Sequence, residues 1–500
     1  MTPRIGLVAA LALGCAGGER AAPVSVSAPV SVSVSVSAPV SAPVSVSAPA
    51  PVPAPAPVSV LIEVTELPAD DAWLVTWHVA APTIGIVFDR RLPSNRHETW
   101  RPGDGLAWGM AGDHEALRAI DGRPRHDFAV RFATDDRSAG RAPALNVRFT
   151  DGSRLLFTAQ VGAAALACDA GEDGGRCERR DRDRSRRWRF HTAPARGLRI
   201  PDAAGRGELT WDEPAGDVRG TYLYAGPIEA IEGDRLTIVV DPGLPAWLVS
   251  ETARRLPALF AFHAAHTGVA LEVEPLLLAS RAEPAARGDA LRGKTLPGLI
   301  QLEAVGRAWD HPSASRRARW FEVLAHESFH LWNSQLARRS GDKRDEWLSE
   351  GAAVYVAGLA LRDAGLLGAR AHEARVVAAA NDCIATLDGP LYSEAADASY
   401  YACGELVHFV IDRQLAATGG VLGAWAAIIA GARARGSYAT ADLLAVVDER
   451  GGDPALGRDL RRILDDGLGP DPAGLVQRLL RDAGLATRRI AGTRRLARRR

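Results

Sequence analysis

HESFHLWN, residues 326–333, is the stretch from which the rest of this chain can be interpreted. On a helix, His326 and His330 lie four residues apart and project from one face, so their imidazoles can converge on one ion. Glu327 lies one position round the helix, where its carboxylate can hold a water molecule bound to that ion. Two histidines and a Glu at this spacing form the HExxH pattern of zinc hydrolases, in which the Glu is a general base.

A second segment, WLSEG at residues 347–351, opens another apolar run after a polar turn. A catalytic zinc ion has three protein ligands and keeps a fourth position for water, and Glu350 is the candidate third ligand. The alternative is a solvated helix face that carries two histidines by chance. The surrounding apolar residues argue against it, because buried His and Glu side chains need partners. These residues are Trp320, Phe321, Val323, Leu324, Phe329, Leu331 and Trp332.

Together the two segments resemble the glycyl aminopeptidase family of gluzincins and, more distantly, aminopeptidase N. The resemblance implies a zinc metallopeptidase with one Zn²⁺ per chain, ligated by His326, His330 and Glu350. It implies that Glu327 takes a proton from the zinc-activated water and delivers it to the leaving amine. It also implies a thermolysin-like α+β catalytic domain that follows a β domain, and a peptide or protein substrate.

The same family carries a Tyr that stabilises the oxyanion, in a Tyr-x-x-Gly pattern that opens a later helix. Here the pattern is Tyr401-Ala402-Cys403-Gly404. The family usually has Lys immediately before the Gly, and this chain has Cys403. Tyr401 is therefore the expected hydrogen-bond donor to the oxyanion, with Tyr400 as the neighbouring candidate.

An edge strand with a Gly-x-x-Glu motif precedes the HExxH helix in aminopeptidases of this class and contacts the substrate. Gly298 and the strand-like residues 299–302 are the matching segment, and Gln301 stands where the family has Glu. Gln cannot provide the anion that captures a free α-amine. Glu303 is a possible substitute, two residues on and therefore on the same strand face at a different depth. Aminopeptidase and endopeptidase specificity both remain open.

The first half of the chain carries short alternating strands separated by turn residues, which is typical of a β-sandwich. We place this β-rich domain at residues 59–225. Its tryptophans, among them Trp73, Trp77, Trp100 and Trp108, are interpreted as core residues, because aromatic residues favour half-buried strands. A carbohydrate-binding platform is the alternative.

The remaining boundaries give a multidomain α+β protein. The zinc metallopeptidase domain spans 226–404, a helical C-terminal region spans 405–487, and a basic tail spans 488–500. Because the tail is rich in Arg and poor in apolar residues, we expect it to be disordered. Nonspecific contact of the tail with anionic lipid is a second possibility.

Residues 1–15 read as a secretion signal, with a short apolar run that is too short to span a bilayer. The run ends in Ala12-Leu13-Gly14-Cys15, which resembles a bacterial lipobox, and a plain signal peptide is the alternative. Residues 16–58 repeat Pro, Val, Ser and Ala, and their prolines predict an extended linker. We therefore expect an exported bacterial protein, periplasmic or at the cell surface, anchored to the membrane by a lipid on Cys15.

The chain has five cysteines, and an exported protein favours disulfides. Cys168 and Cys177 bracket an acidic, Gly-rich loop and form the first expected bridge. Cys383 and Cys403 are candidates for a second bridge. Cys15 then remains as the odd cysteine, which supports its lipidation.

The 60 basic and 60 acidic residues give a formal net charge of zero, so no global field points to nucleic acid. The function expected from the sequence is that of an exported zinc metallopeptidase, aminopeptidase-like in its motifs. Two alternatives stay open. One is an endopeptidase or a non-peptide hydrolase on the same fold, and the other is a non-catalytic surface binding protein with a peptidase-derived scaffold.

Overall fold

The computed structural model describes residues 60–91, 96–135, 146–168, 177–179, 186–213, 219–227, 230–233, 235–451 and 454–499. The predicted signal peptide, the lipidation site Cys15 and the linker 16–58 lie outside these residues. All described residues belong to one unit of the chain, Val58–Arg500, so the domain boundaries proposed within it stay predictions.

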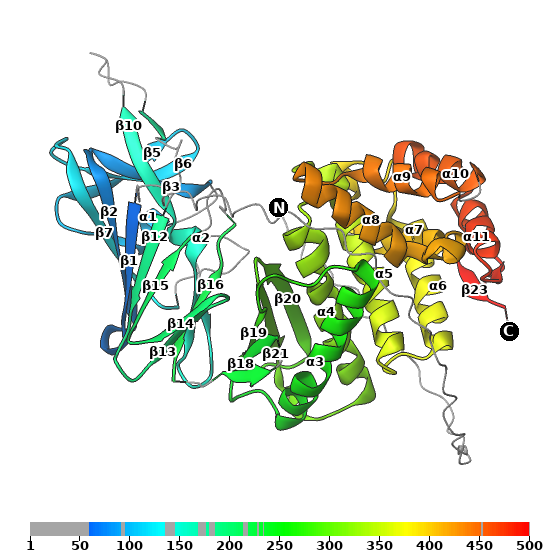
Figure 1. Ribbon diagram of the computed structural model, residues 1–500, viewed down its shortest axis with the longest axis horizontal. Coiled ribbons are helices and arrows are strands. Elements are labelled where there is room, and N and C mark those ends of the chain that lie inside the picture. Colours follow the sequence, from blue (N-terminus) through cyan, green and yellow to red (C-terminus); the bar gives the residue numbers. More distant parts are fainter. Residues whose placement is uncertain are drawn as a thin grey trace, which may run out of the picture. The chain divides into compact units, whose positions relative to one another are not determined.

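The first part of this unit is built from three β-sheets (Figure 1). Their strand orders are β15-β12-β1-β2-β7-β4, β11-β10-β3-β6-β5 and β14-β13-β16-β9-β8. The strands are β1 (Val60–Leu67), β2 (Ala72–Thr83), β3 (Gly85–Arg91), β4 (Arg101–Pro102), β5 (Leu106–Ala111), β6 (His114–Ala119), β7 (Arg125–Ala133), β8 (Asn146–Arg148), β9 (Arg154–Phe157), β10 (Ala163–Cys168), β11 (Cys177–Arg179), β12 (Arg186–His191), β13 (Gly197–Ile200), β14 (Ala203–Arg206), β15 (Glu208–Asp212) and β16 (Tyr222–Gly226). Two short helices are α1 (Arg96–Thr99) and α2 (Thr158–Val161).

Alternation of apolar and polar residues positions the core of this region. Along β1 every second residue is buried, as a half-buried strand requires. Trp73, Trp77 and Trp100 are buried in one hydrophobic cluster, and Trp108 packs against it. The prediction that these tryptophans serve the core is confirmed.

The second part contains a five-stranded sheet with helices over one face (Figure 1). Its strand order is β17-β18-β19-β21-β20, so β20 is an edge strand. β18, β19 and β21 are parallel, and β20 runs antiparallel to β21. The strands are β17 (Ile231–Gly233), β18 (Leu236–Val240), β19 (Leu276–Ala282), β20 (Ala290–Leu296) and β21 (Leu299–Val305).

The helices of this part pack against one another and contribute to one hydrophobic core. They are α3 (Ala246–Thr267), α4 (Ala314–His330), α5 (Glu346–Asp363), α6 (Ala369–Thr386), α7 (Tyr400–Gln414), α8 (Gly420–Arg435), α9 (Thr440–Glu449), α10 (Pro454–Asp466) and α11 (Pro472–Asp482). The Ser313 hydroxyl caps α4 by accepting from the Arg316 N–H. None of the helices among the described residues has the length and apolarity to cross a bilayer. The fold is thus a multidomain α+β architecture with a helical C-terminal region.

The basic tail is ordered, which corrects the sequence expectation. Residues 487–499 contain a hairpin of β22 (Thr487–Arg489) and β23 (Leu496–Arg498). Leu496 is buried, and the Asn381 side chain bonds both its N–H and its carbonyl. Arg498 pairs with Glu373 on α6. The composition of the tail predicted disorder because it is rich in arginine. Composition does not show that one apolar residue is buried or that acidic residues elsewhere form ion pairs with the arginines.

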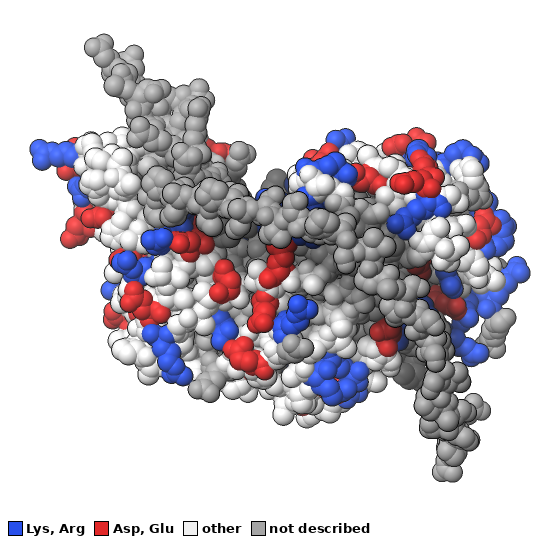
Figure 2. All heavy atoms as spheres, viewed as in Figure 1, with Lys and Arg blue, Asp and Glu red and all other residues white. Residues whose placement is uncertain are grey.

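The charges on the surface are mixed. Figure 2 shows acidic and basic side chains interspersed over the visible face, in keeping with the zero net charge of the sequence. Cys168 lies opposite Cys177 in the pairing of β10 with β11. The side chains of these two cysteines are outside the described part of the chain, so their disulfide stays a prediction.

Candidate functional site

Three potential metal ligands converge between α4 and α5. The Nε2 atoms of His326 and His330 lie 3.1 Å apart. The Glu350 Oε2 atom lies 3.3 Å from the first of these nitrogens and 3.4 Å from the second. One ligand atom from each residue falls within 4.8 Å of the others. Among the described residues, this is the group of His, Cys, Asp and Glu side chains that could hold a metal ion.

The local helix geometry explains this convergence. His330 is the last residue of α4, which continues into a π-helical turn at Leu331–Leu336. Asn333 in that turn accepts a hydrogen bond from His330 Nδ1 at 2.9 Å, and its Nδ2 donates to the Ser349 carbonyl at 2.9 Å. With its Nδ1 proton held by Asn333, His330 presents the lone pair of Nε2 to the cluster. Asn333 also ties His330 to the residue before Glu350.

The electrostatics of the cluster favour a positive charge at its centre. Burial alone would lower the pKa of His330, but the Glu350 and Glu327 carboxylates and Asn333 raise it to about 9. Burial alone would raise the pKa of Glu350, but His330 and His326 hold it well below its usual value. Two imidazoles and a carboxylate are also a donor set that catalytic zinc uses. The residues therefore fit a divalent metal ion.

Glu327 lies beside the ligands and against the edge strand β20. Its side chain is buried, at 8% exposure. Thr295 Oγ1 lies 2.8 Å from Glu327 Oε2 and 2.7 Å from the Glu327 carbonyl oxygen. A Cβ on Gly293 would lie 2.6 Å from Glu327 Oε1. Sequence reasoning missed both residues, because more than thirty positions separate them from Glu327 and only the packing of α4 against β20 brings them together.

Tyr401 rather than Tyr400 lies at the cluster. The Tyr401 ring centroid is 6.2 Å from that of His326. Partial burial and the carboxylates of Glu350 and Glu327 raise the pKa of Tyr401. The hydroxyl therefore stays protonated and can donate a hydrogen bond. Tyr400 is buried, and its hydroxyl donates to the Ser393 carbonyl at 2.6 Å. The structure thus distinguishes the two candidates that the sequence left open.

Close helix packing places Tyr401 next to Glu350. Gly351 on α5 and Gly404 on α7 face each other, and a Cβ on Gly351 would lie 2.3 Å from the Gly404 Cα. Only glycine at both positions permits this approach. A disulfide between Cys383 and Cys403 joins α7 to α6.

An ion network reinforces the same arrangement. Arg375 on α6 pairs with Glu405 on α7 at 2.8 Å and with Glu322 on α4 at 2.9 Å. Glu322 is one turn before His326, and Glu405 is one turn after Tyr401. One guanidinium therefore holds together the helix of the histidines and the helix of the tyrosine.

The substrate-binding residues expected from the sequence are not brought to this cluster. β21, which carries Gln301 and Glu303, is an interior strand between β19 and β20. Gln301 is buried on the same strand face as Leu299, which packs against residues of the first part of the chain. Glu303 accepts from Arg292 at 2.7 Å.

Gly298 shapes the backbone at the start of β21. It has a φ of +62° and lies in the turn between β20 and β21, a conformation that favours glycine. The sequence showed a strand before the helix but not that the preceding strand, β20, folds back and takes the edge of the sheet. β20 is therefore the strand that lies against Glu327 on α4.

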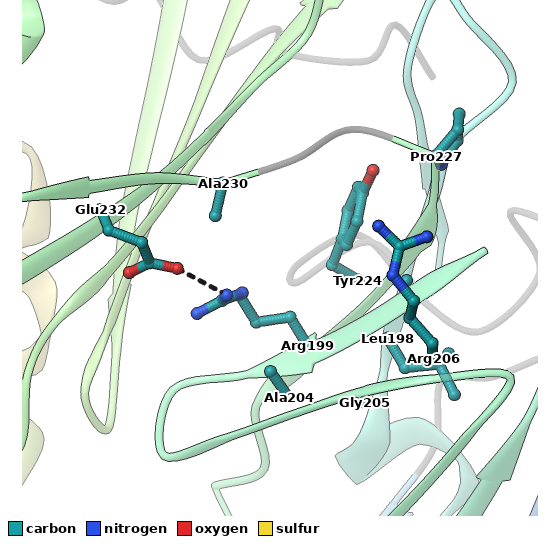
Figure 3. A pocket seen from close by; sticks show the side chains of 10 residues that line it. Leu198, Arg199, Ala204, Gly205, Arg206, Tyr224, Pro227, Ala230 and Glu232 are labelled. Carbon is teal, nitrogen blue, oxygen red and sulfur yellow. Dashed lines mark hydrogen bonds and ion pairs between the residues drawn. The ribbon is translucent and has the colours of Figure 1, made fainter. Parts of the chain in front are cut away.

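Two cavities among the described residues lie away from the metal-ligand cluster. One of about 430 Å³ is lined by β13, β14 and β16 residues and by Glu232. In it the Arg199 guanidinium is paired with Glu232 at 2.7 Å, and Arg206 extends along the other side beside Tyr224 (Figure 3). A second cavity, of about 120 Å³, includes Gly298 in its lining.

Comparisons with known proteins support the fold. No protein-family model and no curated protein matches the chain. An aminopeptidase N family protein from Idiomarina loihiensis superposes with a TM-score of 0.65 at 13% identity, over 86% of this chain and 79% of that one. An M1 zinc metallopeptidase from Deinococcus radiodurans gives a TM-score of 0.46 at 16% identity, over 81% and 92% of the two chains. A variant of that enzyme bound to a Tyr-Ser-Ala substrate gives 0.47 at 17%, over 82% and 93%.

The fold argument rests on the first of these structures. It shows that the chain has a gluzincin-type, aminopeptidase-like fold, which confirms at the level of fold the resemblance seen in the motifs.

Proposed function

We propose that this chain is a zinc-dependent metallopeptidase. His326, His330 and Glu350 would hold one zinc ion, Glu327 would be the general base, and Tyr401 would donate to the oxyanion. The observation that carries the proposal is the convergence of His326 Nε2, His330 Nε2 and Glu350 Oε2 within 4.8 Å of one another. The likeness of the fold to an aminopeptidase N family protein supports it.

The chain's own residues supply the proton transfer. When bound, zinc would polarise the scissile carbonyl and make water a stronger nucleophile at neutral pH. The Glu327 carboxylate, buried against β20, accepts a proton from the attacking water and returns it to the leaving amine. The Tyr401 hydroxyl, whose raised pKa keeps it protonated, donates a hydrogen bond to the negative oxygen of the tetrahedral intermediate.

A specific observation favours an endopeptidase as the second candidate to an aminopeptidase. The edge strand β20 has the sequence ALRGKTL, with no Asp or Glu. An edge strand can dock an extended peptide through its free backbone groups. With no carboxylate on that strand to hold an α-ammonium group, internal peptide bonds are as acceptable as terminal ones.

Export and anchoring belong to the proposal as well. The signal-like residues 1–15 support a periplasmic or cell-surface location, with attachment to the membrane through a lipid on Cys15. The partners would be a peptide or protein substrate and the membrane surface. A hydrolase of non-peptide substrates, and a non-catalytic binding protein on this scaffold, are the alternatives that the experiment must separate.

The experiment is cleavage of a mixed peptide library by the full chain, read by mass spectrometry with and without a zinc chelator. Glu327→Gln is the matched variant, expected to keep zinc and to lose roughly 10²–10⁴-fold in rate. Chelator-sensitive trimming from the N-terminus supports an aminopeptidase, and internal cuts support an endopeptidase. Zinc-loaded protein that cleaves nothing refutes the peptidase, and a Glu327→Gln variant with full activity refutes the base.

A further inference from the structure

We infer that the edge strand β20 positions the general base, through the hydroxyl of Thr295 and the missing side chain of Gly293. The inference rests on the proposed function, in which Glu327 is that base. Thr295 Oγ1 lies 2.8 Å from Glu327 Oε2, which is hydrogen-bond distance. Thr295 is a positioning residue rather than a catalytic one, because it acts on the reaction only through Glu327.

The hydrogen bonding of Thr295 suits both protonation states of Glu327. A hydroxyl has one proton and two acceptor lone pairs. Two Glu327 oxygens, the backbone carbonyl at 2.7 Å and Oε2 at 2.8 Å, are within reach of Thr295 Oγ1. While Glu327 is ionised, the hydroxyl can donate to Oε2. Once the carboxyl carries the proton taken from water, it can donate a hydrogen bond to Thr295 Oγ1. The Thr295 hydroxyl then donates its own hydrogen bond to the Glu327 backbone carbonyl.

This change of hydrogen-bond partners keeps the Glu327 carboxyl in one position both before and after it accepts the proton. The Glu327 side chain would otherwise be free to rotate about its terminal torsion, which is broad for Glu. A general base must stay within hydrogen-bond reach of the proton that it abstracts. Thr295 therefore acts on the turnover step more than on substrate binding.

Gly293 provides the space for the carboxyl. It lies two residues before Thr295 on β20, so both positions face α4. A Cβ there would lie 2.6 Å from Glu327 Oε1 and 2.8 Å from Val323 Cγ1 on α4. Any other residue at 293 would push the Glu327 carboxyl away from the strand.

The test compares Thr295→Val, which removes the hydroxyl at constant shape, with Thr295→Ser, which keeps it. Thr237→Val is the matched control, because its hydroxyl donates to the Glu232 carboxylate at 2.7 Å on the same sheet, away from the cluster. In the zinc-loaded full chain, we expect Thr295→Val to lower kcat by roughly 10–100-fold, as loss of a hydrogen bond to a charged group would. KM and zinc content should stay unchanged, and Thr295→Ser should restore kcat.

Gly293→Ala is the second variant, expected to lower kcat while zinc is retained. Crystal structures of the variants give a readout that needs no activity, in which Thr295→Val and Gly293→Ala should each show the Glu327 carboxyl rotated from its wild-type position. An unmoved carboxyl, or full kcat in Thr295→Val, overturns the inference. If Glu327→Gln is inactive while Thr295→Val is fully active, only this inference fails. If Glu327→Gln is itself fully active, the base assignment fails.

Discussion

Two clusters of buried charged residues in this molecule differ in how their charges are satisfied. In the first part of the chain, the fully buried Arg96 donates to Glu115 Oε2 at 2.7 Å, to Gln160 Oε1 at 2.9 Å and to the Gln160 carbonyl at 3.2 Å. Its guanidinium also lies over the Phe88 ring, 4.9 Å from the centroid. Every nitrogen of this cation has an acceptor, so the charge of Arg96 is satisfied without a ligand.

The cluster between α4 and α5 is not satisfied in that way. His326 Nε2, His330 Nε2 and Glu350 Oε2 lie 3.1–3.4 Å from one another, so a proton or a metal ion has to lie between their lone pairs. The two carboxylates of Glu350 and Glu327 favour positive charge there, and they raise the pKa of His330. The difference teaches that burial of charge does not identify a site. Convergence of acceptors on one point does.

Loss of Glu350 should have the largest effect of the changes proposed for the two clusters. In Glu350→Ala we expect zinc affinity to fall by more than the roughly 10–100-fold that loss of an outer partner costs, and turnover to fall with it. Glu115→Ala, from the other cluster, should keep full zinc content in its folded fraction. Metal analysis after dialysis measures both. Full zinc content in Glu350→Ala would remove Glu350 from the ligand set.

Removal of Arg96 should have the opposite signature. Arg96→Met leaves the buried Glu115 without its cation, which typically costs about 3–5 kcal/mol. Zinc content and turnover per folded molecule should stay at the wild-type level. Denaturant unfolding gives the measurement. Arg187→Met breaks an exposed, solvent-screened pair with Asp212 and is the control, expected to leave the unfolding free energy nearly unchanged.

Tyr401→Phe should sharpen the view that the second cluster is catalytic. The hydroxyl is the expected oxyanion donor, and loss of one such donor costs about 100-fold or more in kcat. Zinc content should not change. Tyr400→Phe loses only its hydrogen bond to the Ser393 carbonyl and should cost about 1 kcal/mol of stability, with kcat retained. Equal kcat losses in the two variants would contradict the assignment to Tyr401.

Acid should weaken the helical region through its buried neutral histidines. Burial lowers the pKa of His408 to about 4, although its bond to the Gly404 carbonyl opposes the shift. The folded pKa is thus below the unfolded value of 6.5, so the unfolded state binds a proton that the folded state does not.

The stability that His408 contributes is therefore present above pH 6.5 and is lost as the pH falls toward 4, by about 2 kcal/mol between pH 6.5 and pH 5. In His408→Phe, the fall in unfolding free energy over this range should be smaller by about that amount. Denaturant unfolding of both proteins at pH 6.5 and pH 5 gives the measurement, and an equal fall in the two would contradict the assignment to His408.

Much of the candidate site was predictable from the sequence because helix periodicity is a local property. The four-residue spacing of His326 and His330 fixes both imidazoles on one face whatever surrounds α4. The helix start at Tyr401 was implied by the resemblance to the family's Tyr-x-x-Gly pattern. Asn333 lies within one turn of His330, but its hydrogen bond to that ring is seen only in the structure.

The remaining features depend on contacts between residues far apart in the chain. The sequence assigned the edge strand to Gln301, whereas pairing across the sheet gives that place to β20 and brings Thr295 to Glu327. The choice of Tyr401 over Tyr400 depends on the Gly351–Gly404 contact between two helices.

The amino-acid sequence by itself thus placed the two candidate histidine ligands together, because regular spacing on one helix leaves a pattern in one dimension. Glu350, the base and the type of fold followed from the resemblance of the two motif segments to a known family. Only the tertiary structure decided which strand borders the base and which tyrosine faces the ligands. The order of the strands and the close packing of α5 against α7 are set by the burial of side chains from distant segments. Such contacts leave no local pattern in the amino-acid sequence.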